Sequence, residues 1–141
     1  MRAARSSRRN VMAEPLLDIS PVQGIVRVDK PWGHEIIWAR TEQYVGKLLH
    51  IRAGHKLSLQ YHKVKDETVH VQDGQMMFIV EEEGSMVERI LNPGDSYHIT
   101  PNTKHRMVAI TDCNILEVST PELDDVVRLE DSYGRVGTSA P

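Results

Sequence analysis

The chain has 141 residues, of which 40% are hydrophobic and 26% are charged, and its formal net charge at pH 7 is -3. This length accommodates one domain with a hydrophobic core, but not two independent domains. The single cysteine, Cys113, excludes an internal disulfide, and no apolar run is long enough to span a bilayer. We therefore expect one domain with one site, in the reducing environment of the cytoplasm and without a membrane anchor.

The first 14 residues differ in charge from the rest of the chain. They contain four arginines and one acidic residue, a net charge of +3, so the remainder carries -6. A short Arg/Ser-rich arm is compatible with contact to nucleic acid or with a transit peptide, but it lacks the apolar segment of a secretory signal. We interpret residues 1–21 as a basic, disordered arm. Because the rest of the chain is acidic and has no basic stripe, we expect no nucleic-acid partner.

From Val22 onward, short β-type runs alternate with turn signals. The runs are rich in β-branched or alternating apolar residues, which is typical of strands. Sequences such as "QDG" and "NPGD" separate them and are typical of turns. No ten-residue helical pattern occurs. The ten predicted strands cover residues 24–29, 34–39, 44–53, 56–63, 67–72, 75–82, 86–91, 96–100, 105–111 and 114–119.

Strands this short at such regular spacing predict an all-β fold, either a sandwich or a barrel. Jelly-roll closure is a natural solution because it protects the sheet edges. We expect a single domain over residues 22–135. The final segment, "PELDDVVRLEDSYGRVGTSAP", is interpreted as an acidic extended tail that covers one end of the domain, with residues 136–141 disordered.

Metal-capable side chains are concentrated around the fourth predicted strand. Side chains two apart on a strand point to the same face, so Gln60 and His62 can aim at one point. Glu67 opens the next strand, and His105 follows a second strand and tight turn, "PGDSYHITPNTKH". If the fold pairs these segments, two nitrogens and two oxygens converge. Such a ligand set suits zinc, manganese, iron(II), cobalt or nickel and does not select among them.

The spacing of these residues resembles the two cupin motifs. The first motif reads Gly54, five residues, Gln60-x-His62, four residues, Glu67, six residues, Gly74, and the second reads Gly94, five residues, Thr100-Pro101-Asn102, two residues, His105. Gln60 replaces the usual first histidine. Asn102 replaces the glycine of a Pro-x-Gly turn, and asparagine tolerates the left-handed conformation. The resemblance implies a cupin-type double-stranded β-helix, which is a jelly-roll barrel, with Gln60, His62, Glu67 and His105 as metal ligands.

A Gln, His, Glu, His set is similar to that in the cupin domains of phosphomannose isomerases. Three flanking segments resemble the C-terminal cupin of the type II, bifunctional enzymes: "KPWGHE" at 30–35, "AGHKLSLQYH" at 53–62 and "VVRLEDSYGR" at 126–135. The nucleotidyltransferase domain of those enzymes is missing, so we expect no nucleotide-sugar synthesis. Two positions depart from the family, at Lys63-Val64-Lys65 and at Val69, and they leave the exact sugar open.

The resemblance implies aldose–ketose isomerisation of a phosphorylated sugar, with mannose 6-phosphate to fructose 6-phosphate as the expected reaction. A divalent metal ion, with zinc expected and manganese, cobalt, nickel or iron as alternatives, would polarise the C1 and C2 oxygens while a base moves a proton between the carbons. The sequence does not separate two candidates for that base, His98 and Glu117.

Binding a dianionic phosphate requires cations near the pocket mouth. Lys47 is one candidate because it shares its strand face with apolar residues, an unusual place for a lysine unless the interior uses its charge. Arg135 is the other, because it resembles the family's C-terminal arginine, which implies that it folds back over the pocket. We predict that Lys47 and Arg135 take part in substrate binding and catalysis.

Alternation in the fourth predicted strand conflicts with the cupin motif. Read by itself, the strand would bury Leu57, Leu59 and Tyr61 and expose Gln60 and His62. The cupin motif requires the opposite orientation, with the apolar residues outside. Such an exposed row would be an interaction patch. We therefore predict a homodimer that buries Leu57, Leu59 and Tyr61.

Two other functions remain open at this stage. One is a different metal-dependent cupin enzyme, such as an iron(II) dioxygenase or a lyase acting on a small acid. The other is a non-catalytic sugar-binding cupin, because a fold does not determine function. Trp32 is interpreted as a packing anchor rather than a sugar platform. The remaining histidines, His34, His50, His55 and His70, are interpreted as structural.

Overall fold

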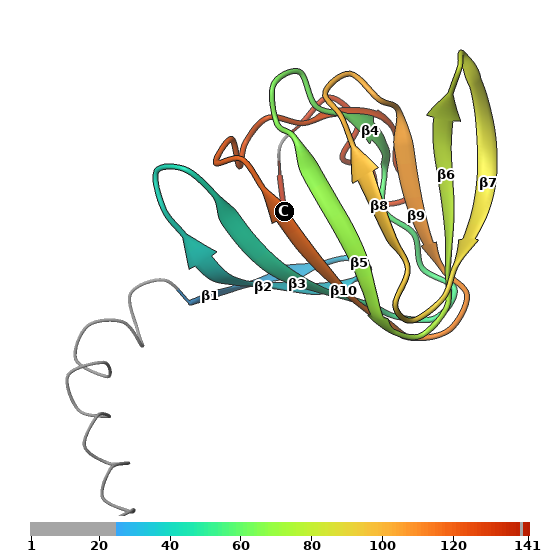
Figure 1. Ribbon diagram of the computed structural model, residues 1–141, viewed down its shortest axis with the longest axis horizontal. Coiled ribbons are helices and arrows are strands. Elements are labelled where there is room, and N and C mark those ends of the chain that lie inside the picture. The colour runs from blue at the N-terminus through green and yellow to red at the C-terminus, as the bar shows by residue number, and fades with distance from the viewer. Residues whose placement is uncertain (1–24, 139) are drawn as a thin grey trace, which may run out of the picture.

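The computed structural model describes residues 25–138, 140 and 141, which form two antiparallel β-sheets (Figure 1). The six-stranded sheet contains, in spatial order, β1 (Val26–Lys30), β2 (Gly33–Arg40), β3 (Val45–Ile51), β10 (Cys113–Ser119), β5 (Glu67–Asp73) and β8 (Ser96–Ile99). The five-stranded sheet contains β11 (Val127–Glu130), β4 (Leu59–Tyr61), β9 (His105–Ala109), β6 (Met76–Glu82) and β7 (Ser85–Leu91). The all-β jelly-roll prediction is confirmed. The predicted arm, residues 1–21, lies outside the described residues.

The hydrophobic core lies between the two sheets. In β3, β5, β6 and β10, alternate side chains are buried, as expected for strands with one covered face. The fully buried side chains include Ile51, Val71, Phe78 and Ile115, and Trp32 joins them from the turn between β1 and β2. Part of this core also lines the pocket that contains the buried polar residues.

Each of the ten predicted strands overlaps an observed one, but two segments differ from the expectation. The fourth is reduced to β4, because residues 56–58 contact β9 through one isolated bridge and one backbone hydrogen bond. The predicted acidic tail contains β11, which pairs antiparallel with β4. The charged residues around this strand made it difficult to recognise from the sequence.

The described part of the chain contains no helix with the length and apolar character that a membrane span requires.

Two turns place the motif residues. Gly74 has φ of +86°, and a side chain there would bring its Cβ within 2.1 Å of the backbone oxygen of Asp112, so only glycine fits. Asn102 has φ of +64°, which confirms that asparagine takes the left-handed conformation in the second motif. Its backbone N–H donates to the carbonyl of His62 at 2.6 Å. The turn of the second motif is therefore tied directly to a residue of the first.

The homodimer prediction rested on the orientation of three apolar residues. Leu57 packs against the core and lines the interior pocket, so its predicted outward orientation is wrong. The backbone is irregular between Lys56 and Leu59, which breaks strict alternation there. Leu59 and Tyr61 lie on β4 and are partly buried within one chain. The homodimer itself stays a prediction.

Candidate metal centre and pocket

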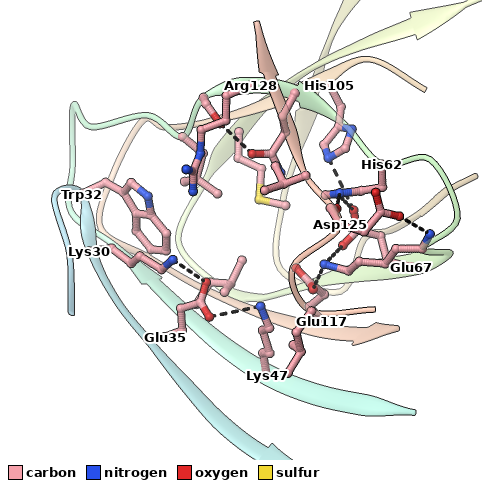
Figure 2. A pocket seen from close by; sticks show the side chains of 18 of the residues that line it. Lys30, Trp32, Glu35, Lys47, His62, Glu67, His105, Glu117, Asp125 and Arg128 are labelled. Carbon is pink, nitrogen blue, oxygen red and sulfur yellow. Dashed lines mark hydrogen bonds and ion pairs between the residues drawn. The ribbon is translucent and has the colours of Figure 1, made fainter. Parts of the chain in front are cut away.

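The predicted metal ligands come together in an interior pocket between the two sheets. His62 follows β4, Glu67 begins β5 and His105 begins β9, so both sheets contribute. Figure 2 shows the three side chains converging on one side of this pocket. Each of the three residues is at most 3% exposed. The fold thus buries three polar side chains together, which requires strong compensation.

The side chains of His62, Glu67 and His105 lie close enough to one another to bind a single ion. Glu67 Oε2 lies 2.8 Å from His62 Nε2 and 3.4 Å from His105 Nε2. One ligand atom from each residue lies within 4.8 Å of the others, which is compatible with a single ion between them. Burial by itself raises the pKa of Glu67, but His105, His62 and Lys65 outweigh it and hold that pKa well below its usual value. Glu67 is therefore a carboxylate.

The outer nitrogens of both imidazoles determine what the inner nitrogens can do. His62 Nδ1 lies 2.6 Å from the carbonyl oxygen of Asp125, and His105 Nδ1 lies 2.8 Å from that of Thr103. A carbonyl oxygen only accepts, so each Nδ1 carries a proton and donates it. In the neutral ring, Nε2 then presents a lone pair. This is the tautomer that binds metals, with the outer nitrogen anchored by a carbonyl.

Two imidazole lone pairs and a carboxylate cannot satisfy one another. His62 Nε2 and His105 Nε2 are buried beside the carboxylate of Glu67, which in this tautomer is a second acceptor and not a donor to either nitrogen. A divalent cation between them would accept all three electron pairs, and nitrogen and oxygen ligands suit zinc and related ions. The residues therefore fit a metal ion.

Gln60 lines the same pocket and completes the predicted set. It stands opposite His105 in the pairing of β4 with β9, so both side chains face the interior. The hydroxyl of Ser58 donates to Gln60 Oε1 at 2.6 Å. This contact fixes the amide orientation and leaves a second lone pair on Oε1 for a cation.

Lys65 connects the metal centre to a second buried acid. Its Nζ lies 3.3 Å from Glu67 Oε1 and 3.2 Å from Glu117 Oε2. Burial lowers the pKa of Lys65, but Glu117 and Glu67 more than compensate and raise it, so Lys65 is a cation. For Glu117, burial and then the charge of Glu67 raise the pKa above its usual value. Glu117 therefore gains a proton more readily than an ordinary glutamate.

Lys47 lines the pocket, where it pairs with a buried acid. Lys47 Nζ lies 3.1 Å from Glu35 Oε1, and Lys30 Nζ lies 3.6 Å from Glu35 Oε2. Burial raises the pKa of Glu35, whereas Lys47 and Lys30 lower it further than burial raises it. The carboxylate of Glu35 thus pairs with both lysines (Figure 2).

Arg135 also lines the pocket, but its guanidinium is already engaged. Its Nε and Nη2 donate to the two carboxylate oxygens of Asp131 at 2.8 and 2.7 Å. The hydrogen bonds from Arg135 lower the pKa of Asp131 to about 2. The guanidinium also lies 5.6 Å from the ring centre of Tyr133. Arg135 closes its own turn beside the pocket.

Of the two candidates for the base, only Glu117 lines the pocket. His98 has a 59% exposed side chain and pairs at the surface with Asp66, so it does not reach the interior. Trp32 is 2% exposed and belongs to the core while also lining the pocket. The packing role expected for Trp32 is therefore present.

Sequence reasoning missed five charged residues that line the pocket: Lys30, Glu35, Lys65, Asp125 and Arg128. Asp125 and Arg128 belong to the segment interpreted as a tail. Alternation in "VVRLE" was the available signal, because Val127 and Leu129 point to one face of β11 and Arg128 to the other. An arginine alone on the inward face would then have been a candidate.

Comparisons with known proteins agree with this architecture. No curated protein sequence matches the chain. Among solved structures, KdgF from Halomonas sp. is 26% identical with a TM-score of 0.59, over 68% of this chain and 87% of that one. Oxalate decarboxylase from Bacillus subtilis is 15% identical with a TM-score of 0.67, over 74% of this chain and 30% of that one. The capsular polysaccharide assembling protein CapF from Staphylococcus aureus is 14% identical with a TM-score of 0.63, over 75% and 34%.

The chain spans about a third of the oxalate decarboxylase and CapF chains, and at this level of identity both show the fold alone. The family model described as "Cupin domain" matches residues 47–119, just over half of the chain. That region includes Lys47 and all four predicted metal ligands. The chain belongs to the cupin domain family.

Proposed function

We propose that this protein is a metal-dependent isomerase of a phosphorylated sugar, with mannose 6-phosphate and fructose 6-phosphate as its substrate pair. The observation that carries metal dependence is the convergence of two imidazole lone pairs on the buried carboxylate of Glu67. His62, Glu67 and His105, with Gln60 beside them, would hold a divalent ion. Such an ion supplies Lewis-acid polarisation of a carbonyl oxygen, which isomerisation of a sugar needs.

Glu117 is the group that we assign to proton transfer. It lines the pocket, it is 5% exposed, and it approaches the metal centre through Lys65. An isomerisation requires one group to take a proton from one carbon and return it to the next. A carboxyl group with a raised pKa is suited to hold that proton between the two steps.

The segments that suggested phosphomannose isomerase meet around this pocket. The first segment contributes Lys30 and Trp32 to its lining, and the last contributes Arg128 and Arg135. His55, from the middle segment, lies with Nδ1 2.7 Å from the hydroxyl of Tyr133 in the last. Residues that carry the resemblance are therefore neighbours in space, which supports a shared site rather than scattered similarity.

The charge of the pocket supports an anionic substrate. Five cationic and four acidic side chains line it, and a further acid, Asp131, lies against Arg135. These charges cancel, so a divalent ion would leave an excess of about two positive charges. A phosphate dianion on the substrate balances that excess.

The test follows hydrogen exchange at the sugar. Protein reconstituted with zinc, manganese, cobalt or nickel is incubated with mannose 6-phosphate in heavy water, and NMR follows deuterium incorporation and appearance of fructose 6-phosphate. Deuterium at the migrating position supports the isomerase. Oxygen consumption with bound iron would favour a dioxygenase, decarboxylation or elimination from a small acid would favour a lyase, and thermal stabilisation by the sugar without exchange would favour a binding protein.

Lys47 provides a variant that separates binding from chemistry. We expect Lys47→Ala to keep its metal and to raise KM with a smaller change in kcat, because Lys47 lies beyond the metal cluster and pairs with Glu35. Arg52→Ala is the control, because its guanidinium binds the carbonyl of Pro31 outside the pocket. Loss of metal in Lys47→Ala would contradict the assigned role.

A further inference from the structure

Arg128 is a buried cation without an acidic partner in the described part of the chain. It is 9% exposed, and it stands opposite Gln60 in the pairing of β11 with β4, so its side chain enters the pocket. Its Nη1 donates to the carbonyl of Thr138 at 2.8 Å. Its Nε is buried without any hydrogen-bond partner, and no described carboxylate lies within 4.0 Å of the guanidinium. An unmatched buried guanidinium is unfavourable unless something else supplies the anion.

The other cations of the pocket are matched to carboxylates. Lys65 contacts two acids and Arg135 contacts Asp131 through two hydrogen bonds. Lys30 and Lys47 share the carboxylate of Glu35. Lys30 Nζ lies 3.6 Å from Glu35 Oε2, whereas Lys47 Nζ lies closer, 3.1 Å from Glu35 Oε1. Arg128 is thus the pocket cation with no carboxylate within 4.0 Å among the described residues, and Lys30 is the pocket cation held at the longest distance from its acid.

Neighbouring cations lower the pKa of both Lys30 and Arg128. Burial lowers the pKa of Lys30, and Lys47, Arg128 and Arg135 lower it further against the support of Glu35. Burial and then Arg135 lower the pKa of Arg128. Cations therefore outnumber acids around Arg128 and Lys30. Figure 2 shows these two side chains near Trp32, away from His62 and His105.

Arg128 and Lys30 stand where two chambers meet. The inner chamber, which contains the metal centre, has a volume of about 80 Å³, room for only a few water-sized groups. An outer chamber of about 270 Å³ adjoins it and is lined by Val28, Ile37 and Arg40. Arg128 and Lys30 line both chambers. A molecule that extends from the inner chamber into the outer one would therefore lie beside both side chains.

We propose that Arg128 and Lys30 form an anion-binding site at this junction, which takes the phosphate of a substrate whose reacting end lies in the inner chamber. The guanidinium offers its free N–H groups and the ammonium its remaining protons, which together match a phosphate dianion better than a single-charge group. Direct contact with the phosphate is thus assigned to Arg128 and Lys30, and Lys47 supports it through Glu35, which it shares with Lys30. The choice of phosphate rests on the proposed function, whereas the anion site rests on the unmatched cations.

The test measures binding of inorganic phosphate to the full chain by phosphorus NMR, in metal-free protein so that phosphate cannot bind a metal ion. We expect Arg128→Gln and Lys30→Gln each to weaken phosphate binding about 10-fold to 100-fold, the scale of a lost charged hydrogen bond. Arg128→Lys should retain part of it. Arg89→Gln is the matched control, because it makes the same change of charge at the opposite edge of the sheet that contains Arg128, where Arg89 pairs with Glu82 at the surface.

His105→Ala separates this inference from the proposed function. It removes a metal ligand, so it should abolish isomerisation and still bind phosphate as the metal-free wild type does. Circular dichroism checks that each variant is folded, and Lys30→Gln carries the test if Arg128→Gln is not. Wild-type affinity in folded Arg128→Gln and Lys30→Gln, or no phosphate binding to the wild type, would overturn the site. Binding of acetate without phosphate would retain an anion site and overturn its assignment to phosphate.

Discussion

The imidazole of His62 is held by a residue 63 positions later, because its Nδ1 lies 2.6 Å from the carbonyl oxygen of Asp125. The carboxylate of Asp125 in turn accepts hydrogen bonds from the backbone N–H groups of Lys63, Val64 and Lys65, at 2.7 to 2.9 Å. Asp125 therefore fixes both the tautomer of one metal ligand and the loop that carries the next. Neither function depends on contact with the metal.

This relationship predicts the effect of Asp125→Ala. The loop from Lys63 to Lys65 loses its three charged hydrogen bonds, and His62 loses part of its orientation, so we expect metal affinity to fall about 10-fold to 100-fold. Titration against a competing chelator measures it. Asp124→Ala is the control, since Asp124 is the exposed neighbour. Unchanged affinity in Asp125→Ala would show that the loop holds His62 without Asp125.

Replacement of either histidine should remove the metal. We expect the purified, tag-free wild type to contain about one divalent ion per chain, and His62→Ala and His105→Ala to contain none, because three ligands of a buried site act together. Elemental analysis measures the content. His98→Ala should keep the metal, as His98 lies at the surface. Absence of metal from the wild type, even after reconstitution, would eliminate every metalloenzyme proposal.

Glu117→Gln should separate proton transfer from metal binding. The amide keeps the size of the side chain and cannot accept the migrating proton, so we expect kcat to fall about 100-fold to 10,000-fold while metal content is unchanged. Deuterium exchange into the sugar phosphate reports the same step. Glu130→Gln, which replaces an acid with a 68% exposed side chain, should leave kcat unchanged. Full exchange activity in Glu117→Gln would assign the proton to another group.

A fall in pH should weaken the ion pair between Asp131 and Arg135 that closes their turn. Arg135 lowers the pKa of Asp131 from 3.8 to about 2 in the folded chain. A lowered pKa means that the carboxylate stabilises the fold above the unfolded pKa, and that this stabilisation is lost as pH falls from about 4 through about 2. We expect Asp131→Asn to be less stable to urea at neutral pH and to lose less stability over that interval.

The control for this pH dependence is Asp29→Asn. Asp29 also pairs with an arginine, Arg27, but its side chain is 83% exposed, so its contribution should be small. If wild type and Asp131→Asn lost equal stability between about pH 4 and 2, the pair would not be responsible.

The predicted homodimer remains open to a direct test. Leu59 and Tyr61 on β4 would lie in its interface, whereas Leu57 belongs to the interior of one chain. We expect light scattering at micromolar concentration to give twice the chain mass of 16.0 kDa. Leu59→Glu should shift the mass toward that of a single chain, because a charge in an apolar contact is costly to bury. A monomeric wild type would contradict the prediction.

The sequence by itself determined the local parts of this protein. Alternation of apolar residues located the strands, because side chains alternate between the two faces of a strand. The two-residue spacing of Gln60 and His62 placed both on one face for the same reason. Asn102 adopts the left-handed conformation that its position in the motif required. These features depend on neighbours in the chain, and sequence records them directly.

Only the tertiary structure decided which distant groups share the pocket. Arg128 faces the interior because β11 pairs with β4, and Asp125 reaches His62 because that pairing brings the tail back over the loop. Irregular backbone places Leu57 on the interior side together with Gln60 and His62, which strict alternation along a strand would not allow. The location of β8 leaves His98 at the surface. Such contacts join residues tens of positions apart. Their partners are set by strand pairing and packing, which local sequence patterns do not specify.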